Sequence, residues 1–189
     1  MSGVSKAIVQ PLLSWYDAGH RDLPWRSEPA PYRVWVSEIM LQQTRVEAVR
    51  GYFSRWMNAL PDIPTLAAAD EAVYTKLWEG LGYYSRVRNL HRAAVLLCEE
   101  YGGELPADYD RLLALPGVGE YTAGAVASIA FGLPVPAVDG NVLRVAARLD
   151  NDFTPITDAK FKKQTRERFA ALMPSDRPGD LNQSLMELG

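Results

Sequence analysis

Cysteine, long apolar runs and strand-like patterning are all scarce in this chain of 189 residues. The single cysteine, Cys98, cannot form an intramolecular disulfide, and we expect it to be a small core residue within the apolar run AAVLLCEE. No segment approaches the length of a membrane helix, and the start, MSGVSKAIVQPLL, lacks the pattern of a signal peptide. We therefore expect no membrane partner and a location in the cytoplasm, or in the nucleoid within it.

A strong positive charge is also absent, because the formal net charge is −3. Basic domains are the usual electrostatic footprint of nucleic-acid binding, but net charge does not describe how charge is distributed. One basic cluster is visible, Arg86, Arg88, His91 and Arg92, and we interpret it as a solvated helix face. The negative net charge argues mildly against a nucleic-acid partner but does not exclude one.

Almost every segment has helical spacing of its apolar residues, and the alternation typical of strands is nearly absent. Thr65 and Asp70 are interpreted as N-caps of two short helices, the second running to Trp78. An all-α architecture follows, because no sheet is available for the helices to pack against. The longer helices are predicted over residues 8–19, 32–41, 45–60, 84–101, 141–149, 158–173 and 181–188.

The stretch LLALPGVGEYTAGAVAS, residues 112–128, has the pattern of a helix, a tight glycine turn and a second helix beginning near Glu120. Gly117 and Gly119 carry no side chain, so the backbone there can approach another surface closely. The free N–H groups at a helix N-terminus can bind a nucleic-acid phosphate without a basic side chain. An ordinary corner between helices gives the same pattern, so this stretch alone leaves both interpretations open.

Two carboxylates lie in contrasting surroundings. Glu38, in VWVSEIML, has apolar neighbours that would favour its neutral form and make it a candidate proton donor; the alternative is a glutamate on a polar helix face. Asp139, in PAVDGNVLRV, can be interpreted either as a simple N-cap or as an ionised carboxylate held by helix N–H groups. Glycosidic cleavage uses two carboxylates in opposite roles, because its transition state resembles an oxocarbenium ion.

Six segments occur in one order: LPWR (23–26), PYRVWVSEIMLQQT (31–44), LWEGLGYYSRVRNLH (77–91), LPGVGEYTAGA (115–125), VDGNVLRV (138–145) and NQSLMELG (182–189). In this combination the chain resembles the catalytic domain of MutY-type adenine DNA glycosylases, within the helix-hairpin-helix glycosylase superfamily. The resemblance implies two helical lobes around a cleft. One is a six-helix lobe over residues 29–135, with the hairpin at about 108–130; the other combines residues 1–28 with 136–189.

The resemblance also implies an activity in base excision repair. A monomer would bind double-stranded DNA and remove adenine mispaired with oxidised guanine, or with guanine, by N-glycosidic hydrolysis once the base is flipped out of the stack. Glu38 would protonate adenine N7, Asp139 would stabilise the sugar cation, and Asn141 would support the site by hydrogen bonding. Six further residues would bind adenine or DNA. They are Arg26 and Gln183 near the adenine pocket, Gln43 and Tyr83 at the duplex near the lesion, and Val118 and Gly119 at a phosphate.

Tyr121 bears on the class of reaction. Bifunctional glycosylases of the endonuclease III type carry a lysine at this place in the motif, and its amine attacks the sugar, forms a Schiff base and leads to strand cleavage. A phenol cannot form a Schiff base. The resemblance therefore implies a monofunctional glycosylase with Tyr121 at the catalytic site, and it disfavours the bifunctional alternative.

One departure concerns the cofactor. The family binds a four-iron–four-sulfur cluster through four cysteines that follow the NQSLMELG segment, whereas this chain has only Cys98. We expect no metal or cluster to be ligated by these residues, and a cluster in a full-length family member. The chain is then either a fragment of a longer protein or a natural cluster-free form. An inactive or weakly active DNA-binding fragment stays open as the alternative to an enzyme.

Overall fold

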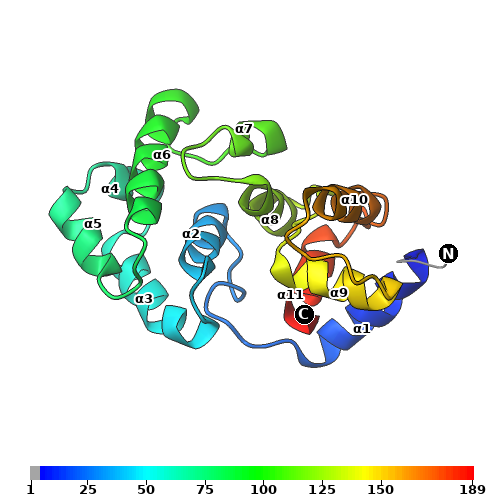
Figure 1. Cartoon of the computed structure of the whole chain (residues 1–189). Coiled ribbons are helices and arrows are strands. Elements are labelled where there is room, and N and C mark those ends of the chain that lie inside the picture. Colours follow the sequence, from blue (N-terminus) through cyan, green and yellow to red (C-terminus); the bar gives the residue numbers. More distant parts are fainter. Residues whose placement is uncertain (1–4) are drawn as a thin grey trace. The chain divides into compact units, whose positions relative to one another are not determined.

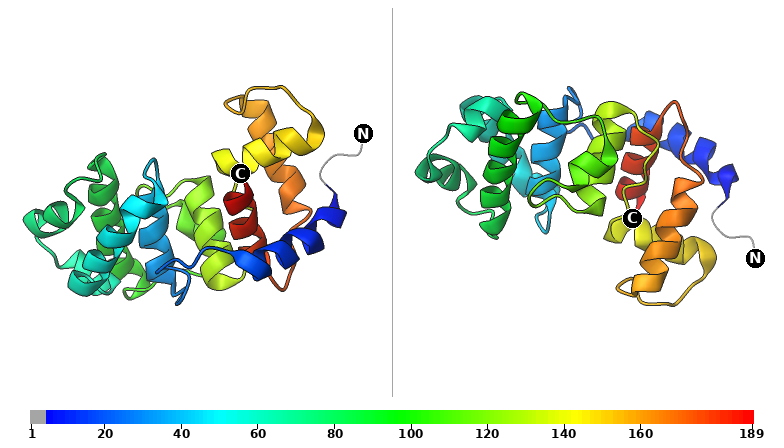
Figure 2. Two further views of the ribbon diagram at one scale, coloured as in Figure 1. Left: turned by 90° about the horizontal axis from the view of Figure 1, so that it is seen from below. Right: turned by 90° about the horizontal axis from the view of Figure 1, so that it is seen from above.

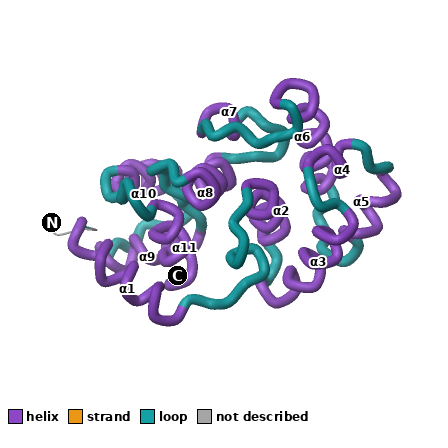
Figure 3. The backbone as a smooth tube through the Cα atoms, turned by 180° about the vertical axis from the view of Figure 1, so that it is seen from behind, coloured by secondary structure: helices purple, strands orange, loops and turns teal. Residues whose placement is uncertain are grey.

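The computed structural model describes residues 5–189, in which helices are joined by short loops (Figure 1). Those residues contain no strand, as the tube coloured by secondary structure shows (Figure 3). The predicted all-α class is confirmed. None of the described helices is both long enough and apolar enough to cross a membrane. The elements are η1 (Lys6–Ile8), α1 (Val9–Gly19), α2 (Pro31–Leu41), α3 (Val46–Ala59), α4 (Ile63–Ala67), α5 (Glu71–Trp78), α6 (Ser85–Tyr101), α7 (Tyr109–Leu113), α8 (Glu120–Phe131), α9 (Gly140–Asp150), α10 (Ala159–Ala170) and α11 (Pro178–Leu188).

Aspartate caps set several of the helix starts. In α4, α7, α9 and α10 the N-cap is an aspartate whose side chain accepts a hydrogen bond from the third amide of the helix. The predicted cap at Thr65 is wrong, because Thr65 lies inside α4 and its amide donates to Asp62 at 2.8 Å. Pro64 fits the first turn of α4, where a missing N–H has no helical partner to lose. Asp70 does stand at the N-cap position of α5, although its side chain makes no capping hydrogen bond.

The chain divides into two compact units. Unit 2 spans Asp22–Thr122 and contains α2 to α7, whereas unit 1 combines the chain up to Arg21 with Ala123–Gly189. The second dividing point falls within α8, so this helix contributes its first turn to unit 2 and its remainder to unit 1. The lobes expected from the resemblance place the two dividing points later in the chain, at 28/29 and 135/136.

Unit 2 has a core built around tryptophan. Trp35, Trp56 and Trp78, from α2, α3 and α5, are fully buried, and the rings of Trp56 and Trp78 meet edge to face with centroids 5.6 Å apart. The Tyr32 hydroxyl donates to the Leu60 carbonyl oxygen at 2.8 Å and accepts from Trp56 Nε1 at 3.0 Å. Burial raises the pKa of Tyr32, so its hydroxyl stays protonated and can serve as this donor.

Unit 1 joins the first long helix of the chain to the last. Helix α1 packs along α11, α11 also contacts α9, and α10 packs on α9 (Figure 2). Their buried apolar side chains form one core, so residues from both ends of the sequence stabilise the same unit. The core residues are Val9, Leu12, Leu13, Val142, Leu143, Val145, Ala146, Phe161, Phe169, Leu181 and Leu185.

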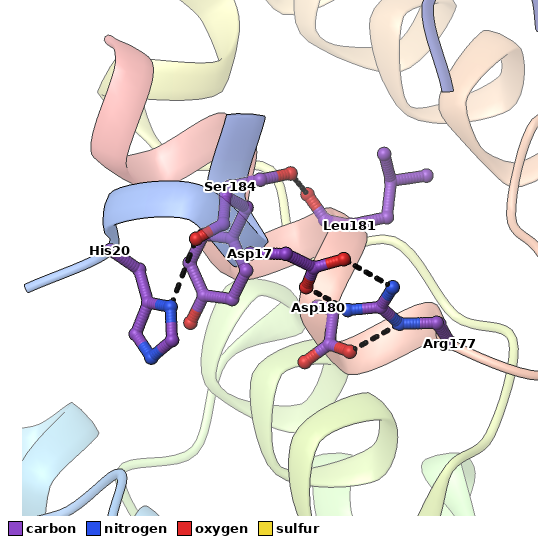
Figure 4. Close-up of polar contacts among 7 residues, drawn as sticks. Asp17, His20, Arg177, Asp180, Leu181 and Ser184 are labelled. Atoms are coloured by element: carbon purple, nitrogen blue, oxygen red, sulfur yellow. Dashed lines mark hydrogen bonds and ion pairs between the residues drawn. The ribbon is translucent and has the colours of Figure 1, made fainter. Parts of the chain in front are cut away.

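Polar contacts also link α1 and α11 (Figure 4). The Arg177 guanidinium donates to both carboxylate oxygens of Asp17, at 2.9 and 2.5 Å, and its Nε donates to Asp180 at 2.7 Å. The hydrogen bonds from Arg177 hold the pKa of Asp17 below its usual range. Exposed ion pairs contribute little stability on average, so we assign this network to orienting the two helices.

We expect Tyr32→Phe to lower the free energy of unfolding by about 1–3 kcal/mol, because the Trp56 N–H and the Leu60 carbonyl would be left buried without this partner. Urea denaturation followed by tryptophan fluorescence measures the change. Tyr84→Phe is the matched control, since Tyr84 is exposed, and it should change stability by less than about 0.5 kcal/mol. Equal midpoints for Tyr32→Phe and the wild type would contradict the assigned role.

Candidate active site

Glu38 is a buried carboxylic acid in the last turn of α2. Only 6% of its surface is exposed, and its neighbours Ser37 and Ile39 are buried as well. Helix α2 carries apolar residues on most of its circumference. Glu38 is therefore buried at a position that would face solvent in an amphipathic helix. The alternative of a glutamate on a polar face is wrong. A buried carboxyl group requires hydrogen-bond donors.

Tyr121 supplies a donor to Glu38. Its hydroxyl donates to Glu38 Oε2 with an oxygen–oxygen distance of 2.6 Å, which is typical of a hydroxyl bonded to a carboxylate. The next residue of α8, Thr122, accepts a hydrogen bond at its Oγ1 from Gln42 Nε2 at 3.3 Å. The end of α2 is thus joined to the start of α8 by two side-chain contacts. A carboxyl group held in this way has one oxygen oriented by the phenol and can exchange a proton.

The turn before α8 contains two glycines with different roles. Gly117 has a positive φ of 76°, and a Cβ at this position would stand 2.7 Å from the Cβ of Asn89 on α6. Gly117 therefore lets the turn pack closely against α6 of the same unit rather than against another molecule. The Val118 amide donates to the Leu115 carbonyl oxygen at 3.1 Å, so it already has a partner. At Gly119, a Cβ would meet no atom within 4 Å, which leaves open space at the start of α8.

Asp139 is the N-cap of α9 in unit 1. Its Oδ1 accepts from the Val142 amide at 2.9 Å, and its Oδ2 accepts from Asn141 Nδ2 at 2.7 Å. Arg144 donates to the Asn141 side-chain oxygen, which turns the amide NH2 of Asn141 toward Asp139. Both oxygens of Asp139 are thus held by donors from its own helix, an arrangement suited to a fixed anion. The interpretation as an N-cap is confirmed.

Asn182 positions the segment that leads to Asp139, although it is not among the residues predicted from the sequence. It is buried on α11, and its Nδ2 donates to Ser128 Oγ at 2.7 Å and to the Val135 carbonyl at 2.9 Å. Its Oδ1 accepts from the Ala137 amide at 3.0 Å. The spacing of its buried neighbours Pro178, Leu181 and Leu185 is the signal that places it on the inner face.

A glycine of α8 makes room for the same segment. A Cβ on Gly124 would lie 2.5 Å from the Pro136 carbonyl oxygen, a separation that real Cβ atoms essentially never show. Helix α8 and the chain at residues 135–137 are therefore in direct backbone contact within unit 1. Together with the two hydrogen bonds from Asn182 to Val135 and Ala137, this contact fixes the backbone two to four residues before Asp139.

The remaining predicted residues differ in exposure. Gln43 and Tyr83 are exposed, and each has the left-handed backbone conformation that non-glycine residues rarely adopt, with φ of 59° and 47°. Arg26 is half-buried, and its amide donates to the Leu23 carbonyl at 2.8 Å, so LPWR forms a turn. Gln183 is half-buried on α11, beside the buried Asn182.

The structure thus joins some predicted residues by direct contact. Glu38 and Tyr121 are hydrogen-bonded within unit 2, and Asp139 and Asn141 are hydrogen-bonded within unit 1. Gln43 and Tyr83 belong to unit 2, where they lie in two turns that both accept hydrogen bonds from the half-buried Arg86.

Residues 5–189 do not fit an iron–sulfur cluster. They contain no group of three or more His, Cys, Asp or Glu side chains placed to hold a metal ion. The only cysteine, Cys98, is half-buried on α6, whereas a cluster of the kind implied by the resemblance needs four thiolates. No step of the chemistry is therefore assigned to a cluster.

Comparison with known proteins places most of these residues inside one family. A family model described as HhH-GPD superfamily base excision DNA repair protein matches residues 36–173. The chain is 47% identical over 187 residues to the adenine DNA glycosylase of Mus musculus, 46% over 187 residues to that of Homo sapiens and 43% over 180 residues to that of Mycolicibacterium smegmatis. Each alignment covers 94% of this chain but only 36%, 34% and 60% of the relative, so the chain spans a part of these proteins.

Solved structures show the same fold. A thermostable thymine-DNA glycosylase superposes with a TM-score of 0.86 at 27% identity, covering 96% of this chain and 83% of that one. A non-covalent endonuclease III–DNA complex superposes with a TM-score of 0.80 at 23% identity, covering 97% and 85% of the two chains. At the lower identity the likeness concerns the fold alone.

We expect Asn182→Ala to lower the free energy of unfolding by about 3 kcal/mol, because the Ala137 amide and the Val135 carbonyl would lose their buried partner. Gln183→Ala, one residue further along α11 and half-buried, is the matched control and should cost less than about 1 kcal/mol. Urea denaturation measures both variants. Equal effects of the two substitutions would refute the assigned role of Asn182.

Proposed function

The chain belongs to the HhH-GPD superfamily of base excision DNA repair proteins, and on this premise we propose that it is a monofunctional DNA glycosylase that removes adenine mispaired with oxidised guanine or with guanine. The observation that carries the proposal is the 2.6 Å hydrogen bond between the buried Glu38 and Tyr121. It joins a carboxylic acid to a phenol where a strand-cleaving relative would have a lysine. The high identity to adenine DNA glycosylases supports adenine as the substrate.

In the proposed reaction, Glu38 is the general acid. Its proton moves to N7 of the flipped-out adenine, the bond between N9 and the sugar C1′ breaks, and the electron pair of that bond leaves with the neutral base. A water molecule then adds to C1′ and returns a proton to the Glu38 carboxylate. The products are free adenine and an abasic site. The hydrogen bond from Tyr121 keeps the carboxyl group oriented through both proton transfers.

Asp139 has the complementary role in this proposal. The sugar acquires positive charge as the glycosidic bond breaks, and a fixed carboxylate lowers the energy of that cation. Two donors from α9 hold Asp139, one from the Val142 amide and one from Asn141, so the carboxylate needs little rearrangement when the charge develops. The family resemblance assigns Arg26 and Gln183 to the adenine pocket, and the Gln183 amide can pair with the edge of adenine.

We assign four residues of unit 2 to the duplex. Gln43 and Tyr83 are exposed on turns and would contact the bases near the lesion. Gly119, at the open start of α8, would offer its amide to a phosphate. The Val118 amide donates to Leu115, so its contact with the same phosphate would be a shared, three-centre hydrogen bond. The protein would act as a monomer on double-stranded DNA, in the cytoplasm or nucleoid.

We expect Glu38→Gln to reduce single-turnover excision of adenine by about 10²-fold or more, because an amide cannot donate the acid proton. The assay uses a duplex with adenine opposite oxidised guanine and reveals abasic sites with alkali. Glu100→Gln, at an exposed position of α6, is the control and should match the wild type. Excision that persists in Glu38→Gln would overturn the mechanism, and duplex binding without excision by the wild type would support a DNA-binding module.

We expect Tyr121→Lys to gain strand cleavage, because a lysine amine can attack the sugar C1′ and form a Schiff base. The measurement is the yield of nicked product and of a protein–DNA adduct trapped by borohydride. Tyr121→Phe, which removes only the hydroxyl, should form no trapped adduct. A trapped adduct already present with the wild type would show that the monofunctional assignment is wrong.

A further inference from the structure

Two members of the basic cluster, Arg86 and His91, depart from the solvated helix face that the sequence predicts, and the half-buried His91 stacks its ring on Tyr74. Arg88 has an exposed side chain and pairs with Glu71 at 3.0 Å, as expected of such a face. The Arg86 side chain instead turns into unit 2, and burial lowers its pKa. No carboxylate in residues 5–189 pairs with it. Its two terminal nitrogens, but not its buried Nε, donate to one hydroxyl, that of Thr44, and to five carbonyl oxygens, those of Ile39, Met40, Gln42, Leu81 and Gly82.

The two terminal nitrogens of Arg86 together bind two different turns, and the nitrogen that binds the second turn also donates to the Thr44 hydroxyl in the first. One donates to the Ile39 and Met40 carbonyls at 2.9 and 3.1 Å and also to that of Gln42, which are groups left without helical partners at the end of α2. The other donates to the Leu81 and Gly82 carbonyls at 3.0 and 3.3 Å. The negative end of the α2 dipole also favours a cation at this place. A single planar guanidinium thus links the end of α2 to the loop before α6.

Each of these turns contains a strained residue. In residues 5–189, the non-glycine residues with positive φ are Gln43, Tyr83 and Asn151. Asparagine tolerates this conformation, whereas glutamine and tyrosine are held in it at a cost of about 1–2 kcal/mol. Gln43 lies between two groups that Arg86 binds, the Gln42 carbonyl and the Thr44 hydroxyl, and Tyr83 directly follows the Gly82 carbonyl. Such strain persists only where surrounding contacts fix the backbone.

Aromatic faces complete the surroundings of Arg86. Its guanidinium carbon lies 5.3 Å from the centroid of the Trp78 ring and 5.6 Å from that of Tyr83. Trp78 Nε1 also donates to the Gly82 carbonyl at 3.0 Å. A lysine could not reproduce this arrangement, because a single ammonium has three donors and no planar fork to span two turns.

We propose that Arg86 is a positioning residue that locks the Gln43 turn and the Tyr83 turn into one rigid unit for contacting the duplex. The inference rests on the proposed function, in which Gln43 and Tyr83 touch DNA. Two turns whose backbone is fixed before binding need less ordering when the duplex arrives, which favours affinity. Arg86 therefore acts on DNA through the two turns rather than by touching a phosphate.

The first test measures the lock itself and needs no DNA. Hydrogen–deuterium exchange in residues 41–45 and 80–84 should be ~10-fold faster in Arg86→Lys than in the wild type, with other segments changed less than about twofold. Arg88→Lys is the matched control and should leave both segments unchanged. Equal exchange in Arg86→Lys and the wild type, or faster exchange throughout the chain, would overturn the proposal.

A wild-type measurement covers the case in which Arg86→Lys fails to fold. The backbone order parameters of Gln43 and Tyr83 should be about 0.85, the value of rigid backbone, although both residues are exposed. Values below about 0.6 would show flexible turns and would refute the lock without any variant.

The second test separates positioning from direct contact. Arg86→Lys should weaken duplex binding, measured by fluorescence anisotropy, by ~10-fold in the wild-type background but less than about twofold in a Gln43→Ala, Tyr83→Ala background. An equal loss in both backgrounds would contradict positioning and indicate that Arg86 binds DNA itself. Failure of the wild type to excise adenine would count against the proposed function alone, because this assay measures only binding.

Discussion

A buried carboxyl group must be given a hydrogen-bond donor, and much of unit 2 is arranged so that Glu38 receives one from Tyr121. The contact requires the end of α2 and the start of α8 to lie close enough for the Tyr121 hydroxyl to reach Glu38 Oε2 at 2.6 Å. Gly117, packed against Asn89, sets where the turn before α8 passes over α6. The end of α2 is fixed by the Arg86 guanidinium, which donates hydrogen bonds to the carbonyl oxygens of Ile39 and Met40, the two residues after Glu38. The position of Glu38 relative to Tyr121 therefore depends on the backbone at the end of α2 and in the turn before α8.

The two carboxylates of the proposed site are held over very different distances along the chain. The Asp139 partners named above lie within three residues, so the first turn of α9 suffices to orient it. The phenol that binds Glu38 lies 83 residues away and depends on the folding of unit 2. Loosening of the unit 2 core would therefore disturb the acid while leaving the Asp139 cap intact, because a capping bond forms with its own helix.

The same difference between local and long-range contacts explains which features can be predicted from the sequence. The helices and the N-cap positions of Asp70 and Asp139 follow from patterns within a few residues, and they are predictable. The partners of Asn182 are 45 to 54 residues away, and those of Arg86 mostly more than 40. Local spacing can place Asn182 on the inner face of α11, but no pattern within a few residues reveals the partners of either side chain. Thr65 was misassigned for a local reason, because Asp62 competes for the same cap. The roles of Gln43 and Tyr83 come from the family resemblance, whereas their backbone strain is visible only in the fold.

The contact between Gly124 and the Pro136 carbonyl has a consequence for reading mutational data. A single added methyl group at Gly124 would clash with the backbone of the segment that leads to Asp139, although glycine has no side chain that could take part in a reaction. A saturation screen scored by repair would rank this position beside the acids and amides of the site. At Gly124, intolerance to substitution would reflect the short distance between two backbone segments. Such a screen would therefore suggest a catalytic role for a residue whose only constraint is steric.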